Sequence, residues 1–178
     1  MKKILLALSI LLLLAAGALY ALKGKSSYDP ARYSLELRPA NKPFGVGSTI
    51  AFTLPDQFGK AHTLSPETKI MVFAFTKTTG HIIKAAMADK PKGFLERHKA
   101  VLVADISGMP TVIQNMFALP DLRKSDYSML LIYDKNMAKR LKEGQATDKV
   151  IVMHLENGKV TKVEHADSPE ALNKALGA

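Results

Sequence analysis

The residues that could do chemistry lie together in one short polar stretch behind a long apolar run. The stretch reads Thr76-Lys77-Thr78-Thr79-Gly80-His81. A threonine hydroxyl beside a histidine resembles a nucleophile with its base, but no third group that would orient His81 is evident. The simpler interpretation is that Thr78 or Thr79 caps a helix. The free N–H groups of that helix start, together with Lys77, could also hold an anion.

The amino-acid composition excludes several other catalytic chemistries. The 178 residues include no cysteine, which excludes thiol redox catalysis, thiolate–metal binding and covalent haem attachment. The five histidines show no ligand spacing. A turn at Asn157-Gly158 would pair residue 154 with 161 and residue 150 with 165, leaving His154 and His165 roughly 13 Å apart. We therefore expect neither a metal site nor a cofactor.

Alternating strands and helices must position the polar stretch. Continuous apolar runs predict strands buried on both faces at 69–76, 100–107 and 128–134, and helical spacing predicts helices at 79–88, 110–119 and 136–142. Hairpins are expected at 50–64 and 150–165, and a last helix begins after Ser168. This order predicts an α/β three-layer sandwich with an N-terminal β-hairpin.

The N-terminal segment has the pattern of an export signal. Lys2 and Lys3 precede an apolar run at residues 4–22, long enough for a bilayer span. We favour an uncleaved signal anchor at 1–22 over a signal cleaved near Ala16-Gly17-Ala18. Residues 23–48 then form a linker and residues 49–178 the domain. Both versions place residues 28–178 outside the cytoplasm, with the anchored version in the inner membrane and facing the periplasm.

Positive charge suggests partners. The net charge is +9, and outside the cytoplasm an anionic membrane surface or an acidic protein is a better partner than nucleic acid. Solubility alone also explains the charge. Basic residues gather around the first helix, where they either face a partner or form a solvated helix face: Lys84, Lys90, Lys92, Arg97, His98 and Lys99. We expect Met109, Met116, Phe117 and Leu119 in the core.

The stretch IAFTLPDQFGKAHTLS at residues 50–65 resembles the N-terminal hairpin of the redoxin branch of the thioredoxin superfamily. That branch includes the alkyl hydroperoxide reductase/thiol-specific antioxidant proteins and membrane-anchored thiol–disulfide oxidoreductases. The resemblance covers roughly residues 46–178 and depends on the order of elements more than on motifs. It implies a thioredoxin-like fold with its active-site position at residues 76–81.

Both places that carry the family's chemistry are altered. In one alignment Thr78 and His81 occupy the Cys-x-x-Cys positions, whereas in the peroxiredoxin-like register Thr76 is retained and Thr79 replaces the cysteine. The loop expected to carry a cis-proline, residues 145–149, contains no proline. We therefore predict a non-catalytic, membrane-tethered module that binds or stabilises a partner. The alternatives are an enzyme that uses the threonines with His81, and a thiol-independent folding helper.

Overall fold

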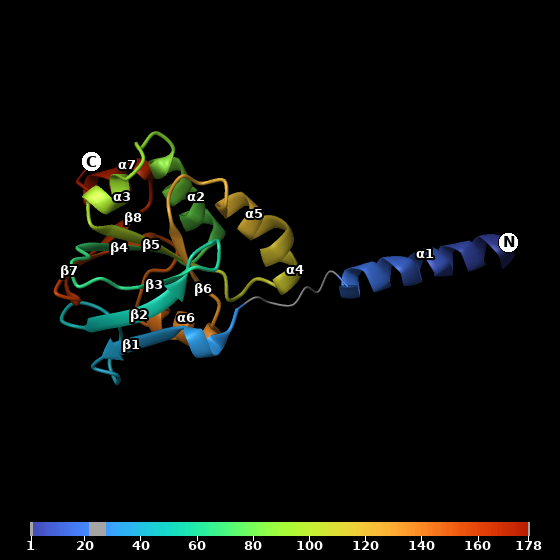
Figure 1. Cartoon of the computed structure of the whole chain (residues 1–178), viewed down its shortest axis with the longest axis horizontal. Coiled ribbons are helices and arrows are strands. Elements are labelled where there is room, and N and C mark those ends of the chain that lie inside the picture. Colours follow the sequence, from blue (N-terminus) through green and yellow to red (C-terminus); the bar gives the residue numbers. More distant parts are fainter. Residues whose placement is uncertain (1, 22–27, 178) are drawn as a thin grey trace.

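The computed structural model describes residues 2–21 and 28–177 (Figure 1). The N-terminal elements are α1 (Lys2–Ala21), η1 (Pro30–Arg32), β1 (Ser34–Arg38), β2 (Thr49–Pro55) and β3 (Ala61–Thr63). The middle of the chain forms β4 (Ile70–Ala74), α2 (Lys77–Met87), α3 (Phe94–Arg97), β5 (Ala100–Asp105), α4 (Thr111–Ile113), η2 (Gln114–Ala118) and α5 (Leu119–Leu122). The last elements are β6 (Met129–Ile132), α6 (Lys135–Lys142), β7 (Val150–Glu156), β8 (Lys159–Ala166) and α7 (Pro169–Ala175).

One mixed sheet organises the chain, in the order β1-β2-β8-β7-β4-β5-β6, with β3 paired to β2. Strands β4, β5 and β6 are parallel, and β7 joins β4 antiparallel. The predicted α/β three-layer sandwich with its N-terminal hairpin is confirmed. Because β4 and β5 run parallel, their carboxyl ends meet at one edge of the sheet, where β4 leads into α2.

Both faces of β4 are buried, as its unbroken apolar sequence predicts. Val72 and Ala74 belong to the core beneath α2 and α7, whereas Met71, Phe73 and Phe75 belong to the core shared with α6 and β2. Successive side chains of a strand alternate between faces, so a strand in the middle of three layers needs apolar residues at every position. This burial anchors β4 in the core, and Thr76 follows two residues after the strand ends.

The structure corrects the predicted linker at residues 23–48. Ser34–Arg38 form β1, paired antiparallel with β2, and the core includes Leu37 and Phe44 at 5% and 2% exposure. Tyr28 stacks between Tyr33 and Tyr133, with ring centroids 5.3 Å and 4.9 Å away. Most of the Pro and Gly residues that suggested a tether lie in the turn between β1 and β2: Pro39, Pro43, Gly45 and Gly47. The folded part therefore begins near Tyr28, well before residue 49.

Helix α1 is set apart from the sheet in Figure 1, and its described leucines are exposed. Among the described residues, no helix combines the length and apolarity needed to cross a membrane. The first residue and residues 22–27, which include the end of the predicted signal anchor and the start of the predicted linker, lie outside the described part.

The C-terminal hairpin forms at Asn157-Gly158 as predicted, but its register differs by one residue. A bulge between His154 and Leu155 places His154 opposite Lys162, and His165 opposite Ile151. The bulge inserts one extra residue, Thr161, into β8, which a count from the turn alone misses. The side chain of His154 contacts Glu164 at 2.7 Å. Among the described residues, no group of three or more potential ligand side chains could hold a metal.

Candidate functional site

The start of α2 is held by a capping box centred on Thr76. The Thr76 hydroxyl accepts from Thr79 N at 3.2 Å, and the Thr79 hydroxyl accepts from Thr76 N at 3.0 Å and donates to Thr76 O at 2.9 Å. The prediction that Thr78 or Thr79 is the N-cap is thus wrong, because the helix begins at Lys77. A threonine as the third helical residue can reach back to the cap, and this moves the helix start two residues upstream.

The six residues of the polar stretch therefore separate into buried and exposed members. Thr79 is fully buried, whereas Thr78 and His81 are exposed on the first turns of α2. Thr76 and Thr79 are the pair brought together, with their hydroxyl oxygens 3.1 Å apart. These are the positions of the peroxiredoxin-like register. No hydrogen bond joins His81 to either threonine, so the structure does not assemble a nucleophile–base pair.

An open groove lies beside this helix start, at the carboxyl ends of β4 and β5. Its volume is about 800 Å³, which is within the usual range of small-molecule sites. One side is the first half of α2, from Lys77 to Lys84, and the other is the helical segment from Ile113 to Leu122. We call this space the apolar groove; its apolar lining includes Phe75, Ile106, Met109, Ile113, Met116, Phe117, Leu122 and Met129.

The far wall of the groove contains a π-helical turn, η2. Leu119 N donates to Gln114 O, five residues back, and Pro120 has no N–H with which to continue an α-helical ladder. The buried Gln114 side chain anchors the turn by donating to Ile106 O at 3.0 Å and Met109 O at 2.9 Å. The π turn rotates the following side chains relative to an α-helix, so the wall differs from the simple helix predicted at 110–119.

This wall exposes apolar side chains that we predicted to be in the core. Met116 and Phe117 are 46% and 62% exposed, and Ile113 is 40% exposed. Leu119 is buried and Met109 half-buried, so the prediction holds for those two alone. The available sequence signal was Gln114, a polar residue among apolar ones. If Gln114 faces inward, Met116, two positions further along the helix, faces outward, whereas the exposure of Phe117 follows from the π turn.

A charged pair closes one end of the groove. Asp105 ends β5 with a side chain only 3% exposed; it forms an ion pair with Lys142 of α6 and accepts from Ser107 N at 2.9 Å. The Lys142 ammonium also lies 5.5 Å from the centre of the Phe75 ring. A buried carboxylate needs such a partner, so Asp105 and Lys142 have each other as their charge partner. Sequence reasoning missed both residues, since they are 37 positions apart in the chain.

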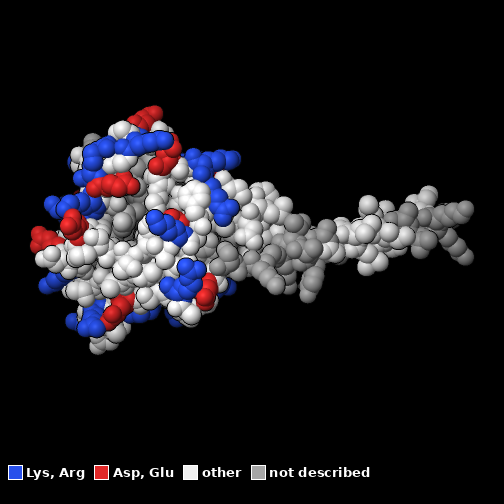
Figure 2. Space-filling model, in the orientation of Figure 1, with Lys and Arg blue, Asp and Glu red and all other residues white. Residues whose placement is uncertain are grey.

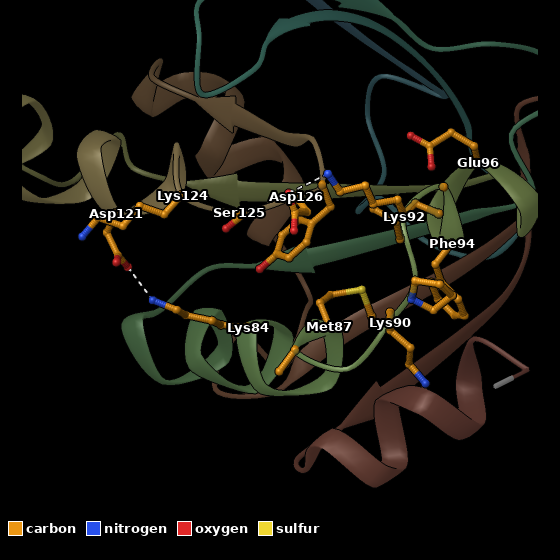
Figure 3. A pocket seen from close by; sticks show the side chains of 15 residues that line it. Lys84, Met87, Lys90, Lys92, Phe94, Glu96, Asp121, Lys124, Ser125 and Asp126 are labelled. Atoms are coloured by element: carbon orange, nitrogen blue, oxygen red, sulfur yellow. Dashed lines mark hydrogen bonds and ion pairs between the residues drawn. The ribbon is translucent and has the colours of Figure 1, made fainter.

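A smaller pocket adjoins the groove, between the C-terminal part of α2, the segment from Lys90 to Glu96 and the segment from Asp121 to Tyr127 (Figure 3). It has a volume of about 270 Å³, and four lysines line it together with Met87, Phe94 and Tyr127; we call it the basic pocket. Its lysines are Lys84, Lys90, Lys92 and Lys124.

Two ion pairs join the walls of the basic pocket. Lys84 reaches Asp121 at 2.8 Å, and Lys92 reaches Asp126 at 3.6 Å, as the dashed lines in Figure 3 show. The hydrogen bond and charge of Asp121 raise the pKa of Lys84, and the Lys84 hydrogen bond lowers the pKa of Asp121. Both groups are therefore charged at neutral pH. Because both pairs are well exposed, they stabilise the fold little.

The basic residues predicted to gather around the first helix divide into two groups. Lys84, Lys90 and Lys92 line the basic pocket. Lys99 instead pairs with Glu67, Arg97 donates to Lys92 O, and His98 Nδ1 lies 2.8 Å from Phe94 O, so these three have local structural contacts. On the face shown in Figure 2, basic and acidic side chains are interspersed, without one broad surface of a single sign. The lysines of the predicted cluster that remain together are therefore those that line the basic pocket.

The loop before β7, residues 145–149, has no proline, as the sequence indicated. Among the described residues the cis peptide bond lies elsewhere, at Arg38-Pro39 after β1. The loop at residues 145–149 therefore lacks the cis-proline that the resemblance implied. Here Gln145 donates to Phe44 O and ties the loop to the segment after β1.

No protein-family model and no curated protein matches the chain. Similar solved structures include the peroxidoxin BcpB from Mycobacterium tuberculosis, with 21% identity, a TM-score of 0.49, and coverage of 75% of this chain and 95% of that one. A thioredoxin-like protein from Porphyromonas gingivalis has 19% identity and a TM-score of 0.46, covering 70% and 86%. A SCO1/SenC family lipoprotein from Bacillus anthracis has 14% identity and a TM-score of 0.46, covering 79% and 96%. From β2 to α7 the chain has the order of strands and helices predicted from the sequence.

Proposed function

We propose that this chain is a non-catalytic binding module whose ligand site is the apolar groove beside α2. The observation that carries the proposal is the exposed apolar wall of Ile113, Met116 and Phe117 along a groove of about 800 Å³. Single exposed apolar residues are ordinary, but three on one wall of a groove are typical of an interaction site. A ligand that covers them removes apolar surface from water, and this stabilises the complex.

The chemistry at residues 76–81 supports binding over catalysis. The chain has no cysteine, so disulfide reductase and peroxidase reactions have no nucleophile. The Thr79 hydroxyl is buried and already donates to Thr76 O, which leaves it unavailable as a nucleophile. Thr78 is exposed, and no hydrogen bond joins it to a base, which an unactivated hydroxyl would need to act as a nucleophile. We therefore favour a binding function over an enzymatic one.

We also propose that the domain is held at the outer face of the inner membrane. The support is the sequence pattern of Lys2 and Lys3 followed by an apolar run at residues 4–22. In α1 the side chains of Ile4 and Leu13 are 71% and 72% exposed, so they are available to an apolar environment.

The groove is tested with the neutral apolar dye Nile red, whose fluorescence rises in apolar sites. We expect Phe117→Ser to lower the dye signal of the full chain, because it removes apolar lining from the groove. The matched control is Phe58→Ser: Phe58 is also 62% exposed, but it lies in the turn between β2 and β3, outside the groove.

Equal dye signals for wild type and Phe117→Ser would contradict the proposed site. So would equal losses in Phe117→Ser and Phe58→Ser, since both side chains have the same exposure. Circular dichroism of both variants shows whether they keep the fold. A stable activity of the purified chain toward a small substrate that depends on Thr78 or His81 would favour the enzyme reading instead.

A further inference from the structure

The apolar groove and the basic pocket adjoin each other, and we call the two together the cleft. They share the lining residues Lys84, Asp121, Lys124, Ser125 and Tyr127. The cleft therefore runs along α2 from its first turn to the segment around Phe94. Each half is lined by four lysines, and the groove half also carries the exposed apolar wall. A ligand that fills the cleft must therefore offer both apolar and anionic groups.

The charge of this cleft is positive and spread along its length. Six lysines line it against four carboxylates, an excess of two positive charges. Three lysines are already in ion pairs: Lys84 with Asp121, Lys92 with Asp126, and Lys142 with Asp105. Within the described part of the chain, the other three form no ion pair: Lys77, Lys90 and Lys124.

These three lysines occupy separate positions along the cleft. Lys77 lines only the apolar groove, Lys90 lines only the basic pocket, and Lys124 lines both. One carboxylate or phosphate head group could reach one of the three. A chain with carboxylates at intervals could reach all of them while its apolar side chains lie against Phe117 and Met116. Glu96 at the rim of the basic pocket is the one carboxylate here outside these ion pairs, and it disfavours anions there only.

We propose that the cleft binds an extended segment of a partner protein in which apolar and acidic residues alternate. This inference rests on the proposed binding function and adds the chemistry of the ligand. The apolar side chains supply affinity by covering the exposed wall. The carboxylates supply specificity and faster association, because they meet lysines whose charge is not already neutralised within the chain. A basic segment is repelled by the same lysines.

The test compares two fluorescein-labelled peptides on the full chain by fluorescence anisotropy. One peptide alternates leucine and glutamate, and the other carries glutamine in place of each glutamate. We expect the acidic peptide to bind about tenfold more tightly, and the difference to shrink in roughly 0.5 M sodium chloride because salt screens exposed charges. Phe117→Ser weakens the binding of both peptides.

The lysines are tested by a triple variant, Lys77→Gln with Lys90→Gln and Lys124→Gln. It should bind the two peptides equally. The matched control is Lys42→Gln with Lys60→Gln and Lys159→Gln, three exposed lysines that lie outside the cleft and form no ion pair in the described chain. This control should keep the preference for the acidic peptide, although it changes the net charge by the same amount.

Three outcomes would overturn the inference. Equal affinity of the two peptides for the wild-type chain, with both dependent on Phe117, would leave the apolar site in place but remove the acidic ligand. An equal loss in both triple variants would show that only net charge matters. Displacement of Nile red by laurate but by neither peptide would identify a small amphiphile as the ligand. If Nile red binding is itself independent of Phe117, the proposed binding function fails as well.

Discussion

At the scale of single residues, Asp56 holds the turn between β2 and β3 together. One carboxylate oxygen accepts from Phe58 N at 2.8 Å and Lys60 N at 2.9 Å, and the other contacts His62 at 2.9 Å. Burial alone would raise the pKa of Asp56, but the His62 hydrogen bond and the two backbone hydrogen bonds outweigh it and lower the pKa. The folded protein therefore favours the charged carboxylate.

This shift predicts a pH-dependent contribution to stability. Because the folded pKa of Asp56 is lowered, its contribution is complete above the ordinary value of about 3.9 and is lost as the pH falls through the folded pKa. We expect Asp56→Ala to lower the free energy of unfolding by about 1–3 kcal/mol at neutral pH, and by less below about pH 3. Urea unfolding at both pH values measures this. Asp148→Ala, which removes an exposed carboxylate, is the control; a pH-independent difference between wild type and Asp56→Ala would contradict the prediction.

Because the chain has no cysteine, the reaction of one introduced thiol with a labelling reagent can be measured without background. Thr78→Cys should react rapidly with a thiol reagent at neutral pH, because it is exposed at a helix start beside Lys77, which lowers a thiol's pKa. Thr79→Cys should react slowly, because residue 79 is fully buried. In the double variant Thr78→Cys with His81→Cys, the side chains lie on neighbouring turns and should form a disulfide under mild oxidation. Faster labelling at residue 79 would mean that the start of α2 is built differently.

At the scale of elements, α2 depends on its cap. Thr76→Ala removes the hydroxyl that accepts from Thr79 N, and we expect a loss of about 1 kcal/mol in the free energy of unfolding. Thr78→Ala is the matched control, since Thr78 is exposed on the same turn and makes no capping hydrogen bond. Chemical denaturation compares the two. Equal stability of both variants would show that the capping box contributes nothing.

At the scale of the whole molecule, the folded part should begin before β1. A chain that starts at residue 49 lacks β1 and the buried side chains of Leu37 and Phe44. We expect it to be less stable by several kcal/mol, since loss of a buried Phe alone costs roughly 3–5 kcal/mol. A chain that starts at residue 28 is the control and should unfold at a higher urea concentration. Equal urea midpoints of unfolding for the two chains would instead support the predicted linker at residues 23–48.

The proposed location makes a second prediction at this scale. We expect the full chain in the membrane fraction, and we expect it to stay there at high salt, because apolar attachment is not screened by ions. Attachment by positive charge alone would be released at about 1 M salt, where the screening length is about 3 Å. A soluble protein that begins near Leu19 would instead show that the N-terminal segment is a cleaved signal.

Local patterns in the sequence determined much of this protein. Unbroken apolar runs predicted β4, β5 and β6, because only a strand covered on both faces needs apolar residues at every position. Ser168 capped α7, and Asn157-Gly158 made the last hairpin, because each depends on side chains and dihedral angles within a few residues. The absence of cysteine excluded thiol chemistry without any structure.

Contacts between distant segments were decided only by the tertiary structure. β1 is short and its sequence resembles a linker, and it becomes a strand because β2 offers it an edge and the core accepts Leu37. Met116 and Phe117 have apolar side chains, and their exposure follows from a π turn that Gln114 anchors to Ile106 O. The cleft exists because α2 and the segment around Asp121, 37 residues away from Lys84, form its two walls. Sequence spacing carries no information on this proximity, since it arises because both segments pack on the same face of the sheet.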